Sequence, residues 1–295
     1  MNKKILVVGS VNIDQTIFTN ELPSLGKTLH GESFIKGIGG KGANQAVAAH
    51  FLGADVSFFG AIGDDDEGRY ISSFFERIGL KSVVKTSKLH TGMAFINTYV
   101  KTGENQILVV RGANSDVNIK DIDNIDQTIK ESQILLTQLE IPVEVVSHLM
   151  KRAKEYGLLT ILNPAPYHDL PDDIYPYIDY LVPNEHELNE LVKEDIPLED
   201  KIGALLNRGV KNVIVTLGEK GSILVNKQES IQVDAHPVKA IDTTAAGDSY
   251  LGALVTALSE NKDIKQAMEF ASKCSSITVT RKGAIASLPK REEIK

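Results

Sequence analysis

Short apolar segments alternate with amphipathic helical segments along most of this chain, and this alternation restricts its fold more than any other feature. Candidate strands cover residues 5–8, 56–59, 134–139, 160–162, 180–182, 213–216 and 222–225. Candidate helices cover residues 43–52, 68–78, 143–156, 185–192, 200–207, 248–259 and 264–279. Such alternation predicts an α/β fold with a mainly parallel sheet, helices on both faces, and ligands beyond the carboxyl ends of the strands. We expect a single domain over residues 1–295.

Two regions, residues 13–37 and 91–111, break this alternation. The strand-like segments within them cover residues 15–18, 33–36, 93–100 and 106–111. A turn around Thr102 and Gly103 joins the last two segments as a hairpin. Short strands without helices of their own bury little apolar surface. We therefore predict that these regions form a small β-sheet lid over the edge of the main sheet.

A turn rich in small residues, Ile241-Asp-Thr-Thr-Ala-Ala-Gly-Asp-Ser-Tyr250, precedes a helical pattern near the C-terminus. The apolar positions of this pattern fall on one helix face: Tyr250, Leu251, Leu254, Val255 and Leu258. Ala245, Ala246 and Gly247 therefore lie where a helix begins. The first N–H groups of a helix have no partner within it, and the helix dipole favours an anion there. We predict that these three residues form an anion hole.

Asp248 lies in the first turn of the same predicted helix, beside the expected anion. A carboxylate in that place repels a phosphate, so it needs a chemical task, and one such task is to remove a proton from an attacking hydroxyl. We predict that Asp248 is a catalytic base. The alternative is an ordinary acidic residue that only offsets the helix dipole.

A second glycine-rich segment, Gly37-Ile-Gly-Gly-Lys-Gly-Ala-Asn-Gln-Ala46, also precedes a helical pattern. Its glycines allow a polar ligand to approach the backbone closely, while Lys41 offers a donor and Asn44 both a donor and an acceptor. The spacing differs from that of a Walker A loop. Taken alone, the segment could also be a plain loop that enters a helix.

The two segments together resemble the paired signatures of the ribokinase (PfkB-type) carbohydrate kinase family. Further matching pieces follow in the order of that family: Asn12-Ile-Asp14, Leu139-Glu140, Asn163-Pro-Ala-Pro166, Asn184-Glu-His-Glu187, Thr216-Leu-Gly-Glu-Lys-Gly221 and Thr280-Arg-Lys-Gly-Ala284 with Ser287. The resemblance extends from about Ile5 to about Ile294. It implies a ribokinase-like fold and an enzyme that uses ATP to phosphorylate D-ribose at O5, giving D-ribose 5-phosphate.

The resemblance also implies which residues form each part of the site. For the sugar it implies Asn12, Asp14, Gly40, Lys41, Gly42, Ala43, Asn44, Glu140 and Asp248. For the nucleotide it implies Asn184, Thr216, Leu217, Gly218, Glu219, Lys220, Gly221, Gly247, Asp248 and Ser272. Several donors and acceptors in fixed positions are what a sugar with many hydroxyls requires.

Two kinds of metal ion are implied in the same way. Glu187 would organise the water shell of Mg²⁺, although an exposed helical Glu is the alternative for this residue alone. A monovalent cation, K⁺, would lie among Asp242, Thr244, Thr278, Arg281, Gly283 and Ser287. His186-Glu187 is not a zinc motif, because position 190 is Glu instead of a second His.

The formal net charge of −7 argues against nucleic acid and an anionic membrane surface as partners. The single cysteine, Cys274, excludes an intrachain disulfide and fits a reducing compartment, so we expect a cytoplasmic protein with an inert core thiol. By resemblance, the lid would join two copies as a homodimer.

Other functions remain open at this point. A deoxyribose, fructose or adenosine kinase would use the same scaffold, and so would a non-catalytic regulator that binds sugar or nucleotide. A nicotinamide-dependent dehydrogenase is rejected, because Gly9-Ser-Val-Asn follows the first strand where Gly-x-Gly-x-x-Gly is required.

Overall fold

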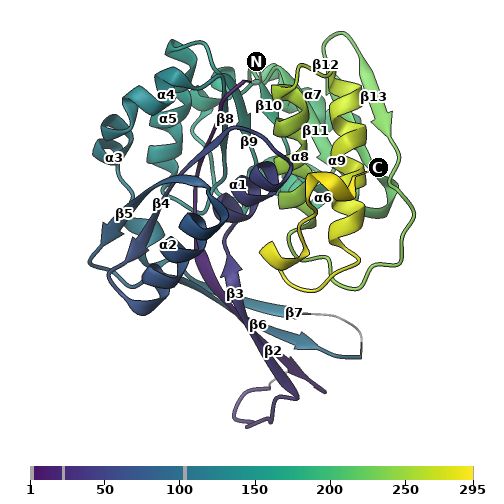
Figure 1. Cartoon of the computed structure of the whole chain (residues 1–295). Helices are drawn as coiled ribbons and strands as arrows, with labels where there is room; N and C mark the ends of the chain where they lie inside the picture. The colour runs from purple at the N-terminus through teal and green to yellow at the C-terminus, as the bar shows by residue number, and fades with distance from the viewer. Residues whose placement is uncertain (1–2, 22–23, 102–104, 295) are drawn as a thin grey trace.

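The central strand β1 (Ile5–Val8) is buried along its whole length and separates two hydrophobic cores. Ile5 and Val7 belong to one core, and Leu6 and Val8 belong to the other. Successive side chains of a strand point to opposite faces, so a strand that is apolar at every position needs cover on both sides. The computed structural model, which describes residues 3–21, 24–101 and 105–294, has this two-sided cover (Figure 1).

The main sheet has nine strands in the order β13-β12-β11-β10-β9-β8-β1-β4-β5. Besides β1 they are β4 (Val56–Gly63), β5 (Lys81–Ser87), β8 (Ile134–Thr137), β9 (Leu159–Leu162), β10 (Tyr180–Leu181), β11 (Asn212–Thr216), β12 (Ser222–Asn226) and β13 (Ser230–Val233). The β11–β12 and β12–β13 pairs are antiparallel, and all other neighbouring strands of this sheet pair in parallel. The predicted strands are confirmed, but β5 and β13 were missed.

Helices cover both faces of this sheet. One core contains side chains from α1 (Lys41–Phe51), α2 (Asp66–Ile78), α8 (Ala246–Ser259) and α9 (Ile264–Thr278). The other contains side chains from α3 (Ile119–Asn124), α4 (Asp126–Glu131), α5 (Val143–Glu155), α6 (Glu185–Leu191) and α7 (Leu198–Asn207). Short 3₁₀ helices cover Gly112–Asp116, Asp172–Tyr177, Gly218–Lys220, Ile285–Ser287 and Arg291–Glu293. The predicted helices are confirmed, whereas α3 and α4 were missed.

A separate four-stranded sheet, called the small sheet below, projects from the helical body (Figure 1). Its strands, in the order β3-β2-β6-β7, are β2 (Asn12–Thr19), β3 (Ser33–Gly39), β6 (Gly92–Tyr99) and β7 (Asn105–Val110). The β2–β6 pair is parallel and the other pairs are antiparallel. The prediction that residues 13–37 and 91–111 form a separate small β-sheet is confirmed, although the turn at Thr102 and Gly103 lies outside the described residues.

Close packing of α1 against α8 determines where the glycine-rich segments meet. A Cβ atom on Gly252 of α8 would lie 2.5 Å from Cβ of Ala48 and 2.8 Å from the carbonyl oxygen of Gln45. Only glycine permits this approach. The first turns of the two helices are thereby held side by side.

None of the helices in the described part of the chain has the length and apolar character that a membrane-spanning helix requires.

Candidate active site

The carboxyl ends of three strands meet the first turns of α1 and α8 around a cavity of about 190 Å³. Residues that follow β9, β10 and β11 line it together with residues from the starts of α1, α6 and α8. The predicted site residues among them are Lys41, Asn184, Glu187, Thr216, Ala245, Ala246, Gly247 and Asp248. Segments up to 207 residues apart in the sequence thus meet at one edge of the sheet, as the alternating pattern predicts.

Asp248 lies in the first turn of α8 and is only 7% exposed. Its Oδ2 accepts a hydrogen bond from Nδ2 of Asn44 at 2.9 Å, and its Oδ1 accepts one from Nε2 of Gln45, also at 2.9 Å. Ala245 precedes the helix in the left-handed conformation, with φ of 59°. The helix therefore begins at Ala246, and the Asp248 carboxylate belongs to its first turn. Of the three N–H groups predicted for an anion, that of Ala246 donates to the carbonyl oxygen of Thr243 at 3.2 Å.

The turn into α1 depends on Gly40, whose φ of 88° is unfavourable for residues with a side chain. A Cβ atom there would also lie 2.8 Å from Cα of Val11. Lys41 follows directly, and its N–H donates to Oε2 of Glu140 at 3.0 Å. The second glycine-rich segment is consequently part of the site and not a plain helix entry.

Carboxylates surround the Lys41 ammonium. Burial alone would lower its pKa, but the charges of Asp248, Glu140 and Glu187 outweigh burial and raise the pKa of Lys41. Burial also raises the pKa of Asp14, which the neighbouring carboxylates of Glu140 and Asp248 raise further, to about 7. A lysine that keeps its positive charge therefore lines the cavity, and Asp14, whose carboxyl group has a pKa near neutral, lies close enough to Asp248 and Glu140 to feel their charges.

Asn12, at the start of β2, is held by a residue that the sequence did not single out. Nδ2 of Asn114 donates to Oδ1 of Asn12 at 2.8 Å and to the carbonyl oxygen of Val11 at 3.0 Å, and Oδ1 of Asn114 accepts from the N–H of Val11 at 3.0 Å. This pairing anchors the end of β2 next to the body. Asp14 lies two residues further along the same strand.

Asn184, predicted for the nucleotide, and Glu187, predicted for Mg²⁺, form a capping box at the start of α6. The Glu187 N–H donates to Oδ1 of Asn184 at 2.8 Å, and Oε2 of Glu187 accepts from the Asn184 N–H at 2.9 Å. Burial raises the pKa of Glu187. Thr216 lines the cavity, and residues 217–221 form the turn beyond it. Ser272 and the turn residues after Thr216 do not line this cavity, and neither do these residues predicted for the sugar: Asn12, Asp14, Gly40, Gly42, Ala43, Asn44 and Glu140.

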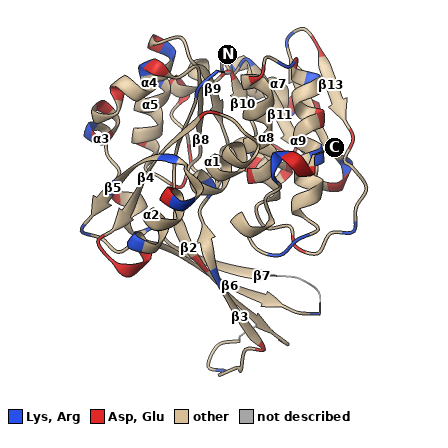
Figure 2. Ribbon diagram, in the orientation of Figure 1, with Lys and Arg blue, Asp and Glu red and all other residues tan. Residues whose placement is uncertain are grey.

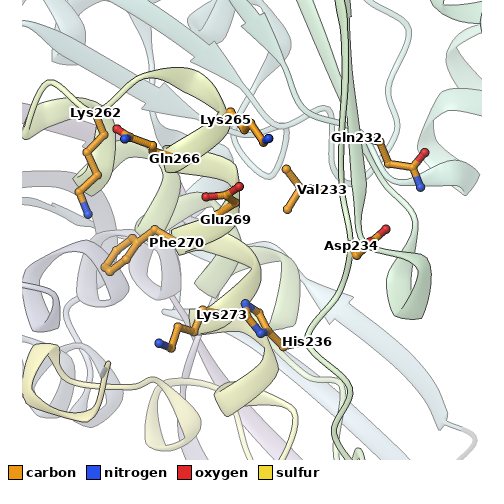
Figure 3. Close-up of a pocket in the computed structure, with 10 residues that line it drawn as sticks. All are labelled: Gln232, Val233, Asp234, His236, Lys262, Lys265, Gln266, Glu269, Phe270 and Lys273. Atoms are coloured by element: carbon orange, nitrogen blue, oxygen red, sulfur yellow. The ribbon is translucent and has the colours of Figure 1, made fainter.

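Ser272 lies on α9, where its hydroxyl donates to the carbonyl oxygen of Asp234 at 3.1 Å. Beside it, a groove of about 770 Å³ separates α9 from β13 and includes Lys262, Lys265, Lys273 and His236 (Figure 3). This groove is larger than the cavity at Asp248, yet none of the predicted site residues line it. The larger groove thus lacks the predicted site residues, whereas eight of them line the smaller cavity at Asp248.

The residues predicted for a monovalent cation come from two neighbouring segments. Oδ2 of Asp242 accepts from the Gly283 N–H at 2.9 Å, and its Oδ1 accepts from the N–H and the hydroxyl of Thr244 at 2.9 and 2.6 Å. Thr278 donates to Ser249 at 2.8 Å, and Arg281 pairs with Glu293. Ser287 donates to the carbonyl oxygen of Ala284 at 2.7 Å. The side chains are thus largely engaged with the protein, so a K⁺ ion at these segments would depend mainly on backbone carbonyl oxygens as ligands.

Mg²⁺ is typically held by one or two carboxylates together with substrate phosphates and water. Glu187 and Asp248 line the same cavity and fit this requirement. Among the described residues, no three His, Cys, Asp or Glu side chains cluster as metal ligands. The donor set therefore suits an ion that arrives with a phosphate ligand.

Several polar residues of the site were missed by sequence reasoning. Ser10 donates to Oε2 of Glu140 and accepts from the Gly42 N–H at 3.3 Å. Other residues not assigned to the site are Asn114, Gln45, Gln138 and Asn163, which contact predicted residues or one another. Two of them had a signal in the sequence, because Gln45 lies inside the glycine-rich motif and Asn163 begins the Asn163-Pro-Ala-Pro166 motif.

The chain matches the pfkB family carbohydrate kinase model over residues 2–291. It is 37% identical to the ribokinase of Staphylococcus aureus (strain COL), covering 100% of this chain and 99% of that protein. It is 42% identical to the ribokinase of Schizosaccharomyces pombe, with coverage of 98% and 96%, and 35% identical to the deoxyribokinase of Salmonella typhi, also with coverage of 98% and 96%.

Solved structures agree in fold over the whole chain. The ribokinase of Thermotoga maritima superimposes with a TM-score of 0.92 at 39% identity, covering 100% of this chain and 98% of that one. The ribokinase of Arabidopsis thaliana, solved with ribose and ATP, superimposes with a TM-score of 0.89 at 30% identity and the same coverage.

Proposed function

This chain belongs to the pfkB family of carbohydrate kinases, and we propose that it transfers the γ-phosphoryl group of ATP to the O5 hydroxyl of D-ribose. One observation carries the proposal: the Asp248 carboxylate faces a cavity at the free N-terminus of α8, held there by Asn44 and Gln45. The ribokinase names of the relatives support the sugar, and the Arabidopsis structure supports both substrates.

The chemistry assigned to these residues is proton removal and charge stabilisation. Asp248 takes the proton of the attacking hydroxyl, and the N–H groups of residues 245–247 receive the negative charge of the transferred phosphoryl group. Lys41 adds a positive charge on the same side of the cavity. Mg²⁺, when bound beside Glu187, would neutralise phosphate charge. Most of the acceleration then comes from positioning and electrostatics.

Sugar recognition is assigned to the polar groups around Asn12, Asp14, Asn44 and Glu140. Asn44 uses Nδ2 for Asp248, whereas its buried Oδ1 has no hydrogen-bond partner among the described residues. A buried acceptor without a partner is costly unless a ligand satisfies it. A sugar hydroxyl would do so. The nucleotide is assigned to Asn184, the turn of residues 216–221 and the α9 surface at Ser272.

The cation proposal concerns residues 242–244 and 278–287, which hydrogen bonds hold together just before α8. A potassium ion among their carbonyl groups would stabilise the turn that presents residues 245–247. An ATP-dependent reaction also fits the cytoplasmic location that the sequence predicts.

We also propose that the small sheet joins two copies of the chain. By strand register, Ile17, Phe34, Phe95, Leu108 and Val110 fall on one face of it. Their side chains are all more than 40% exposed, and Leu108 is 72% exposed. Figure 2 shows few charged residues on these strands, whereas the helical body carries both signs of charge. An apolar face of this kind marks a protein contact.

The test is ADP release from ATP and Mg²⁺ with D-ribose, deoxyribose, fructose, adenosine or no acceptor, with and without potassium. We expect ribose-dependent turnover in the wild type and its loss in Asp248→Asn. Faster turnover with deoxyribose would move the proposal to the reaction named for the Salmonella relative. No turnover with any acceptor, from folded protein that binds ATP, would favour a sugar- or nucleotide-binding regulator instead.

A further inference from the structure

A pair of buried amides, Gln45 and Gln138, lies beneath the Asp248 carboxylate. We infer that this pair is a positioning device for the catalytic base, with Gln45 holding the carboxylate and Gln138 holding Gln45. The inference rests on the proposed function, because it requires that Asp248 acts as the base.

The Gln45 amide is fully engaged. Its Nε2 donates to Oδ1 of Asp248 at 2.9 Å and to Oδ1 of Asn163 at 3.3 Å, and its Oε1 accepts from Nε2 of Gln138 at 2.6 Å. Both glutamines are 0% exposed. With both ends of its amide bonded, the Gln45 side chain has one orientation, and that orientation directs a donor at the carboxylate.

Packing does not explain this pair. Apart from Asn44, the buried positions around Gln45 in α1 are small and apolar: Ala43, Ala46, Val47, Ala48 and Ala49. An apolar residue of similar size would satisfy the core without burying polar atoms. Oε1 of Gln138 is moreover buried without a hydrogen-bond partner among the described residues. A buried acceptor in that state costs stability, so the pair is retained for something other than stability.

The two side chains that donate to Asp248, Asn44 and Gln45, differ in their other contacts. Asn44 belongs to the group assigned to the sugar, and it has a second polar atom to offer. Gln45 is fully buried and does not line the cavity, so it reaches the cavity only through the side chains it bonds, Asp248 at 2.9 Å and Asn163 at 3.3 Å, and Asp248 is the one assigned to the chemistry. Two donors on different oxygens prevent the carboxylate from rotating. A hydroxyl that must lose its proton during attack gains from a base that is already oriented.

The experiment measures kcat and KM for Gln45→Leu, Gln138→Leu and the double variant, using whichever acceptor the wild type phosphorylates fastest. For Gln45→Leu we expect kcat to fall about 10- to 100-fold, with both KM values nearly unchanged, as for an interaction that matters only in the transition state. For Gln138→Leu we expect a smaller fall, of about 3- to 10-fold. In the Gln45→Leu background the second change should have no further effect, because Gln138 acts through Gln45.

The matched control is Thr256→Val in α8, which, like the glutamine variants, removes a fully buried polar group. Thr256 donates to the carbonyl oxygen of Gly252 and lies two turns from Asp248. Its kcat should equal that of the wild type. Gln45→Glu provides an isosteric arm: it keeps the packing but places a second carboxylate beside Asp248, so it should lose at least as much kcat as Gln45→Leu.

The possible outcomes separate the two proposals. A folded Gln45→Leu variant with wild-type kcat, or one changed only in KM, overturns the inference and leaves the proposed function intact. Additive effects in the double variant overturn the role of Gln138. Turnover with an acceptor other than ribose changes the proposed function, while the kcat ratios still test the pair. A wild type that phosphorylates no acceptor overturns both. If Gln45→Leu does not fold, a folded Gln138→Leu variant with unchanged kcat overturns the inference.

Discussion

The cavity beneath α1 and α8 and the small sheet are built on opposite principles. Around the cavity, buried polar side chains such as Gln45 and Asn163 bond to one another, and close helix packing fixes their places. In the small sheet, apolar side chains such as Phe34 and Leu108 are exposed. The comparison shows that the polar groups around the cavity are bonded largely within the chain, whereas the small sheet leaves apolar side chains exposed, and we propose that a second copy covers them.

The largest effect is expected at the cavity. Asp248→Asn should lower kcat about 10²–10⁴-fold, because the amide cannot accept the proton of the attacking hydroxyl. Thermal unfolding should change far less, since the amide is nearly the same size. Steady-state kinetics and a melting curve would measure both. A variant with more than half of the wild-type kcat would contradict the assignment of the base.

A change in helix packing should affect folding as well as the site. Gly252→Ala should lower the free energy of unfolding by about 2–3 kcal/mol, because its Cβ would overlap Ala48. The control is Gly203→Ala on α7, where a Cβ atom would meet nothing within 4 Å. That change should raise the free energy of unfolding by about 0.5–1 kcal/mol. Urea unfolding of both variants measures the contrast, and equal effects would contradict it.

Asp14 lies where the two regions meet, and it makes stability depend on pH. Its pKa is raised to about 7 in the folded state, so its favourable contribution is complete below about pH 4 and is lost as the pH rises toward 7. Asp14→Asn should therefore stabilise the protein more at pH 8 than at pH 5, by about 3 kcal/mol. Urea unfolding at the two pH values measures the difference. The same gain at both would contradict the raised pKa.

The smallest effect on folding is expected in the small sheet. Leu108→Ser should change the free energy of unfolding of a single chain by no more than about 0.5 kcal/mol, since the side chain is exposed. It should nevertheless weaken association of two copies about tenfold or more, equivalent to about 1.4 kcal/mol. Light scattering over a range of concentrations measures this. A wild type that is monomeric at all concentrations would reject the dimer.

The sequence was most informative where burial is strongest. Strands such as β1 and β8 are buried at every position and apolar at all but Thr137, and this pattern predicted them. The missed strands β5 and β13 are mostly exposed edge strands, so their sequences lack that pattern. The missed helices α3 and α4 have six residues each, which is too short for a clear helical period.

The candidate site was only partly predictable from the sequence. Spacing and resemblance singled out Asp248 and Lys41, and in the folded chain both line the same cavity. The partners of these residues could not be read in this way. Asn114 contacts Asn12 over 102 positions, and Gln138 contacts Gln45 over 93. Such pairs depend on the register of strands and the approach of helices, which only the folded chain specifies.

Strand β2 links distant parts of the molecule mechanically. It is fixed at Asn12 by Asn114, carries Asp14 close to that end, and runs to Phe18 at the other, where the Lys282 ammonium lies 5.5 Å from the ring centroid. With about 3.3 Å per residue, Asp14 lies roughly 7 Å from the fixed end and Thr19 roughly 23 Å. Because β2 pairs along its length with β3 and β6, a ligand held at Asp14 would be coupled through one continuous sheet to the segment around Lys282 that precedes the C-terminus.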